Sequence, residues 1–134
     1  MKNFELTPDM LTMSGVFYPT GYAFIMFPDA SAAEQVARDI ESRPGTTDAV
    51  MLLSPATVLK EIGKVEGNSD VTLPSVGTEG ATVRKYVDLA RQGHAALIVK
   101  LGSDEDAELV MVAARKIPFS YGQRYHLLAI QDLE

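Results

Sequence analysis

The sequence predicts an α+β sandwich built from two βαβ units. Residues 22–40 and 96–114 repeat one pattern: an apolar strand-like run, a turn with Asp or Ser, and a helix that carries Ala-Glu near its start. A further β-rich run follows each unit, at residues 48–53 and 121–130. This repeated order is typical of a ferredoxin-like sandwich with a four-stranded antiparallel sheet, and a single domain of residues 21–134 is long enough to bury its core.

The first βαβ unit is preceded by an arm. Residues 1–20 are weakly patterned and contain two prolines, so we expect an arm or a short extra strand, with Phe17 and its neighbours docked on the domain. In the unit itself, residues 22–27 are expected to form the first strand. Ser31 and Glu34 then have the spacing of a capping box, which predicts the start of the first helix.

A two-helix insert, at about residues 55–93, is expected between the second and third strands. Ser54 and Pro55 have the chemistry of an N-cap and a first helical position. A loop at 67–80, rich in Gly, Ser and Thr, separates the two helices, and Gly93 is expected to end the second. The apolar residues at helical spacing in the insert are Val58, Leu59, Ile62, Val65, Val83, Tyr86, Val87 and Ala90.

The second βαβ unit repeats the design of the first. Residues 94–101 are expected to form the third strand, and Ser103 to cap the next helix, whose first turn carries three acids. Arg115 and Lys116 lie near the opposite end, where the helix dipole favours cations. Residues 121–130 are expected to form the last strand as one element.

The expected strands are apolar on both faces. A sheet with helices on one face alternates apolar and polar residues, but residues 22–27 are apolar throughout, as are residues 50–53. Either the insert helices or another subunit therefore covers the second face. We expect self-association through the sheet, as a homodimer or a higher homo-oligomer.

Composition excludes several classes of site. The chain has 134 residues, a formal net charge of -6 and no cysteine. Without cysteine there is no disulfide, thiolate metal site or cysteine nucleophile, and an acidic surface disfavours nucleic acid and anionic membranes. No apolar run approaches the roughly 20 residues that span a bilayer. We therefore expect a soluble, cytoplasmic protein with no nucleic-acid or membrane partner.

Two histidines with basic and aromatic neighbours form the candidate ligand site. Arg can hold a carboxylate or phosphate bidentately, and Tyr can add a hydrogen bond. The candidate residues are Arg84, Tyr86, His94, Arg124, Tyr125 and His126. In the alternative reading, Arg84 is solvated helix surface, His94 follows a helix stop, and Tyr125 or His126 packs at a subunit contact.

Other chemistry has weaker support. The acids at 104–108 are oxygen ligands of the kind that Mg²⁺ or Ca²⁺ takes, but acids at a helix start are explained by the helix dipole alone. The glycines of the 67–80 loop match no phosphate-binding fingerprint, and a flexible connector is the expected reading. We expect no metal and no cofactor, and assign no catalytic residue.

Three stretches carry a family resemblance. They are Gly-Tyr-Ala-Phe-Ile-Met-Phe at 21–27, Gly-Thr-Glu-Gly-Ala-Thr-Val-Arg-Lys-Tyr at 77–86 running into Ala-Arg-Gln-Gly-His at 90–94, and Tyr-His-Leu-Leu-Ala-Ile-Gln-Asp-Leu at 125–133. Together they resemble small bacterial proteins related to the heat-induced general stress protein family. The resemblance implies a stress-associated bacterial protein and supplies no established catalytic residues.

We therefore expect a non-enzymatic, stress-associated bacterial module that binds a partner protein or a small anionic metabolite. Two alternatives stay open. One is a small cofactor-independent enzyme that uses His94 or His126 as the proton carrier in a cavity between sheet and helices. The other is a purely structural oligomer.

Overall fold

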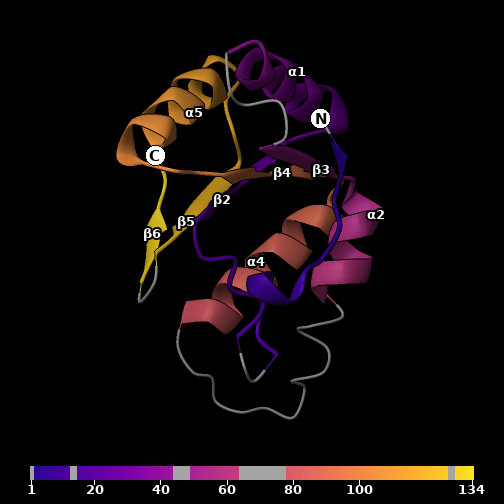
Figure 1. Ribbon diagram of the computed structural model, residues 1–134. Helices are drawn as coiled ribbons and strands as arrows, with labels where there is room; N and C mark the ends of the chain where they lie inside the picture. The colour runs from indigo at the N-terminus through magenta and orange to yellow at the C-terminus, as the bar shows by residue number, and fades with distance from the viewer. Residues whose placement is uncertain (1, 13–14, 44–48, 64–77, 127–128) are drawn as a thin grey trace.

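The computed structural model describes residues 2–12, 15–43, 49–63, 78–126 and 129–134, the side chains of 78–80 excepted. These residues form an α+β fold with one six-stranded mixed sheet. Figure 1 shows three layers, with α1 and α5 above the sheet and α2 and α4 below it. The α+β class is confirmed, while the expected number of four strands is exceeded.

The strands lie in the order β1-β3-β4-β2-β5-β6. Their bounds are Lys2–Asn3 (β1), Tyr22–Phe27 (β2), Val50–Leu53 (β3), Ala95–Lys100 (β4), Tyr121–Tyr125 (β5) and Ile130–Asp132 (β6). β1 runs parallel to β3, and the other neighbours are antiparallel. The two outermost strands are thus additions to the four that the repeat predicts.

The single last strand expected at 121–130 is wrong. The chain turns after Tyr125, where the amide of His126 donates to the carbonyl of Ala129 at 2.8 Å. β6 then folds back on β5, with Arg124 opposite Gln131. The last segment is therefore a hairpin, and its second strand is a free edge of the sheet among the described residues.

The helices have the caps that their sequences favour, with one correction. Their bounds are Ala30–Glu41 (α1), Pro55–Thr57 (α2), Thr78–Arg91 (α4) and Asp104–Lys116 (α5), with a 3₁₀ turn at Pro8–Met10 (η1) and a π-helical turn at Val58–Ile62 (η2). Ser54 and Ser103 cap α2 and α5 as expected. α1 is capped by Asp29, which accepts from the amide of Ala32 at 2.8 Å, so the capping box expected at Ser31 does not form.

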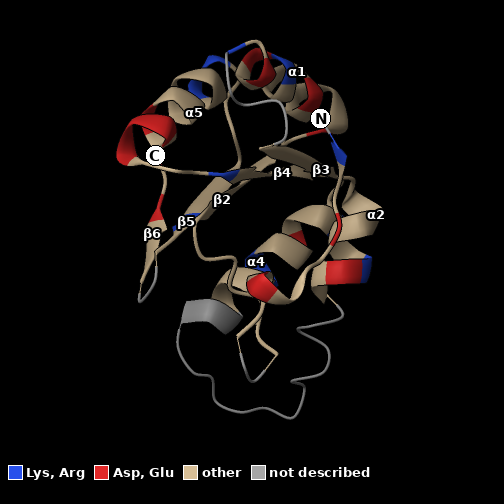
Figure 2. Cartoon of the chain, in the orientation of Figure 1, with Lys and Arg blue, Asp and Glu red and all other residues tan. Residues whose placement is uncertain are grey.

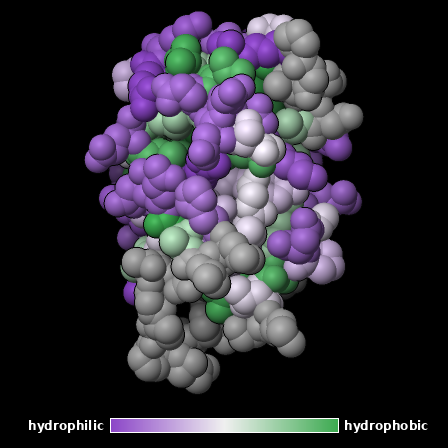
Figure 3. Space-filling model, turned by 60° about the vertical axis from the view of Figure 1, so that its left-hand side comes forward, coloured by the Kyte–Doolittle hydropathy of each residue, from purple (hydrophilic) through white to green (hydrophobic). Residues whose placement is uncertain are grey.

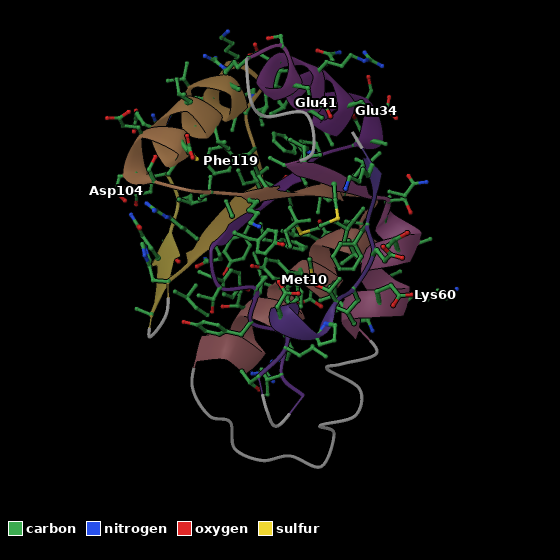
Figure 4. All side chains as sticks on the ribbon, in the orientation of Figure 1. Met10, Glu34, Glu41, Lys60, Asp104 and Phe119 are labelled. Carbon is green, nitrogen blue, oxygen red and sulfur yellow. The ribbon has the colours of Figure 1, made fainter. Side chains whose placement is uncertain are left out.

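The insert and the arm cover one face of the sheet. Phe24, Met26 and Ile98 point from the sheet into a core that α4, η2 and the arm complete. Met10 and Phe17 of the arm are fully buried in it, and Figure 4 places Met10 beside α4. The predicted docking of Phe17 is confirmed; the expected helical position Val65 and most of the 67–80 loop lie outside the described residues.

Both apolar faces of the sheet are therefore covered by other segments of the same chain. α1 and α5 cover the other face, over a second core that includes Ile25, Leu97 and Val110. Of the two alternatives for the second face, the structure shows the insert helices, together with the arm, rather than another subunit. A homo-oligomer stays a prediction. In the described part of the chain, no helix is both long and apolar enough to cross a membrane.

Candidate functional site

An open groove of about 600 Å³ lies between α5 and the β5–β6 hairpin. Figure 3 brings this side of the molecule forward and shows hydrophilic side chains over much of it. The groove is lined by Asp104, Ala107, Glu108, Met111, Arg115, Arg124, His126, Gln131, Asp132, Leu133 and Glu134. Its volume lies within the range of about 300–1,000 Å³ that is usual for small-molecule sites.

Arg124 forms the floor of the groove. It pairs with Ala23 of β2 and Gln131 of β6, so its side chain lies on the face that α5 covers. Its Nη2 lies 2.9 Å from Oδ1 of Asp104, at the start of α5 (Figure 4). The Arg124 side chain is 17% exposed, whereas that of Asp104 is 93% exposed. A mostly buried arginine side chain is thus paired with an aspartate side chain that is almost wholly exposed to solvent.

The remaining polar groups of the groove are joined in short-range pairs. His126 Nε2 lies 2.8 Å from Oε1 of Gln131. Arg115 Nη1 lies 3.4 Å from Oε1 of Glu108, and its Nε donates to the Glu134 carbonyl at 3.0 Å. The pair of Arg115 and Glu108 is exposed, and such pairs contribute little to stability. These groups can therefore change partners at low cost.

The groove carries more acid than base. Four acids line the groove, but the carboxylate of Asp132 accepts from Gln123 Nε2 at 2.6 Å, on the opposite face of the sheet from Arg124. Three carboxylates then remain against two guanidinium groups, a formal balance of −1 when His126 is neutral. Figure 2 shows acidic residues at the start of α5, the helix that forms one wall of the groove. The carboxylates of the groove would repel a ligand that carries only negative charge. Such a ligand therefore needs a close and specific contact with Arg124.

Tyr86 and Tyr125 belong to the core rather than to the groove. Both are buried, and their hydroxyl oxygens lie 2.7 Å apart. The Tyr86 ring stacks on Phe24 with 4.0 Å between ring centres. Burial, the neighbouring Tyr125 and then Tyr121 raise the pKa of Tyr86 well above its usual value of 10.0. The expected role of these tyrosines as pocket walls is therefore replaced by a structural one.

The two histidines do not share a site. His94 Nδ1 lies 2.6 Å from the hydroxyl of Ser120, which precedes β5, whereas His126 follows the other end of β5. Six residues of extended chain separate these ends, or roughly 20 Å. Arg84 is exposed on α4, on the opposite side of the sheet from the groove. Of the six candidate residues, the structure brings only Arg124 and His126 together in the groove.

Sequence reasoning missed the other polar residues of the groove, among them Asp104, Arg115 and Gln131. Asp104 is read from the sequence as one of several helix-start acids, and Arg115 as a helix-end cation. Gln131 falls beyond the strand predicted at 121–130, so its return beside Arg124 is not foreseen. Among the described residues, no group of three or more His, Asp or Glu is placed to hold a metal ion.

Comparisons with known proteins add no relative. Searches against family models, curated proteins and solved structures found no match to this chain.

Proposed function

We propose that this protein is a non-enzymatic binding module that takes a small carboxylate-bearing metabolite in the groove between α5 and the β5–β6 hairpin. The observation that carries the proposal is Arg124, whose guanidinium lies on the floor of the groove with one exposed carboxylate as its partner. A guanidinium presents five N–H donors in a planar fork, and a single ion pair leaves part of that fork for a ligand.

Burial makes Arg124 the stronger of the two guanidinium groups in the groove. Its side chain is 17% exposed, against 49% for Arg115. A charge-assisted hydrogen bond gains strength where water is excluded. The ligand's carboxylate therefore binds at the floor, and its remaining atoms lie along Ala107 and Met111 of α5.

A binding role accounts for the histidines better than the enzymatic alternative does. His94 is bonded to Ser120 outside the groove, and His126 lies within it beside the side-chain amide of Gln131. Neither contact is the histidine–carboxylate pair that orients a general base in many enzymes. His126 is then a polar wall of the site.

The wider proposal keeps the expected fold family and context. The inner strands β3-β4-β2-β5 are antiparallel throughout, which supports a ferredoxin-like core of four strands with α1 and α5 on one face. β1, β6 and the insert are additions to that core. A stress-associated bacterial role follows from the resemblance described above, and self-association remains part of the proposal without a surface assigned to it.

The test is a titration with isocaproate, a small carboxylate with an apolar tail, followed by backbone amide NMR shifts. We expect saturable shifts confined to α5, β5 and β6. Replacing the guanidinium, Arg124→Gln, should weaken binding about ten- to hundredfold, because a charged hydrogen bond contributes roughly 1.5–3 kcal/mol.

Arg84→Gln is the matched control, because it removes the same charge from an exposed helix on the other side of the sheet. It should leave the affinity unchanged. If isocaproate still binds to Arg124→Gln but no longer binds to Arg84→Gln, the ligand binds near α4 and the proposal is wrong.

A further inference from the structure

We infer that the ligand is a zwitterion, an α-amino acid with an apolar side chain, and that it binds by separating Arg124 from Asp104. The inference rests on the proposed function, because it concerns the same groove. It follows from the unequal exposure of the two partners in the Arg124–Asp104 pair, from the charge balance of the groove and from its apolar wall.

The unequal exposure decides which partner moves. Arg124 is held in the sheet and is 17% exposed, while Asp104 is 93% exposed at the first turn of α5. Asp104 keeps its contact with water whether or not it is paired, so leaving Arg124 exposes no buried carboxylate. Asp104 can therefore swing into solvent at little cost, and a ligand carboxylate can take its place on Arg124.

The charge balance decides what the ligand must carry. A ligand with a carboxylate alone would free Asp104 beside Glu108 and leave one more unpaired negative charge in a groove that is already acidic. A ligand that also carries an ammonium group can pair that group with the released Asp104. One internal ion pair is then exchanged for two external ones, with no change in the charge of the groove.

The apolar part of the lining decides the side chain. Ala107 and Met111 face the groove from α5, and Leu133 faces it from the segment after β6. Leu133 also packs against the second core, so this wall is held in place. An aliphatic side chain of the size of leucine can bury apolar surface against this wall.

The experiment compares three probes by isothermal titration calorimetry: L-leucine, isocaproate and isoamylamine. The second lacks the ammonium group of leucine, and the third lacks its carboxylate. We expect L-leucine to bind about tenfold more tightly than either probe, since each lacks one charged contact.

The variant Asp104→Asn gives a readout of opposite sign for two probes. It should weaken the binding of L-leucine, because the ammonium group of leucine loses its partner. It should strengthen the binding of isocaproate, because isocaproate no longer competes with a carboxylate for Arg124. Asp104 is almost wholly exposed, so the variant is expected to fold. Glu105→Gln removes the same charge from the same turn without lining the groove, and should change neither affinity.

The outcomes separate this inference from the proposed function. If isocaproate and L-leucine bind equally and both are lost in Arg124→Gln, the zwitterion inference is wrong and the proposed function stands. If none of the three probes binds, both are wrong. If Asp104→Asn weakens isocaproate as much as L-leucine, the exchange at Arg124 is refuted.

Discussion

The hydroxyl pair of Tyr86 and Tyr125 allows the sharpest test of the core. It joins the insert to the sheet, because Tyr86 lies on α4 and Tyr125 on β5. Both side chains are fully buried, and the oxygen atoms lie 2.7 Å apart. Replacing either residue by Phe removes one hydroxyl and leaves the other without its partner in this pair.

The expected magnitudes follow from that geometry. Each single variant, Tyr86→Phe or Tyr125→Phe, should lower the free energy of unfolding by about 1–3 kcal/mol, the cost of a buried polar group that has lost its hydrogen bond. The double variant should lose less than the sum of the two, because no hydroxyl then remains to be satisfied across the pair. A coupling of about 1–2 kcal/mol is expected for groups in direct contact.

The wild type, the two single variants and the double variant form a double-mutant cycle, and urea unfolding followed by circular dichroism measures the free energy of unfolding of each. Tyr121→Phe is the control, because Tyr121 packs edge-on against Tyr86 with 5.8 Å between ring centres and is only partly buried. It should change the unfolding free energy by less than about 0.5 kcal/mol. Additive losses for Tyr86→Phe and Tyr125→Phe would refute the hydroxyl contact.

Three further predictions concern stability. The pKa of Tyr86 is raised in the folded protein, so the unfolded chain releases this proton at a lower pH than the folded one. The free energy of unfolding should therefore be unaffected below about pH 10 and fall as the pH rises above it. Urea unfolding should show that the fall with pH is smaller in Tyr86→Phe, and an equal fall in both proteins would contradict the burial of Tyr86. Phe17→Ala should cost about 3–5 kcal/mol, measured by thermal unfolding, because the side chain is fully buried between arm and sheet; a loss below about 1 kcal/mol would mean that the arm does not dock. Gly93→Ala should lower the free energy of unfolding by about 1–2 kcal/mol, since φ is +94° at Gly93. Gly63→Ala should leave it nearly unchanged, because Gly63 has a helical φ of -64° and a Cβ there would make ordinary contacts. Equal effects of the two variants in urea unfolding would argue against the left-handed turn at Gly93.

Local signals were sufficient for much of the fold. The apolar run at Tyr22–Phe27 gives the central strand with its bounds. Ser54 and Ser103 cap helices because their hydroxyls accept from backbone amides three residues on. These features depend on neighbouring residues, which a single sequence contains in full.

The errors arose where several local patterns compete or where no turn signal exists. Asp29 and Ser31 are both good N-cap residues, and the choice between them depends on how the chain leaves β2. The hairpin after Tyr125 has no Gly, Pro or Asn between its strands, so the sequence at 126–129 reads as continued strand.

The candidate site could be predicted only in part, because it depends on contacts distant in sequence. Arg124 and His126 follow from the pattern of the last strand, but the partner of Arg124 is Asp104, twenty positions earlier on another element. Tyr86 and Tyr125 are correctly placed on a helix and a strand, yet only the packing of the insert over the sheet shows that they face one another. The side-chain types show which interactions these residues can form, but only the fold shows which of the residues are in contact.

The proposed binding of a small carboxylate to Arg124 can be tested inside the groove itself. The most direct test is an isotope-filtered NOE measurement on the protein saturated with isocaproate, with the methionine methyl groups labelled. We expect NOEs from the methyl protons of the ligand to the methyl group of Met111, which lines the groove. Saturation with NOEs only to Met10 or Met26, in the other core, would contradict it.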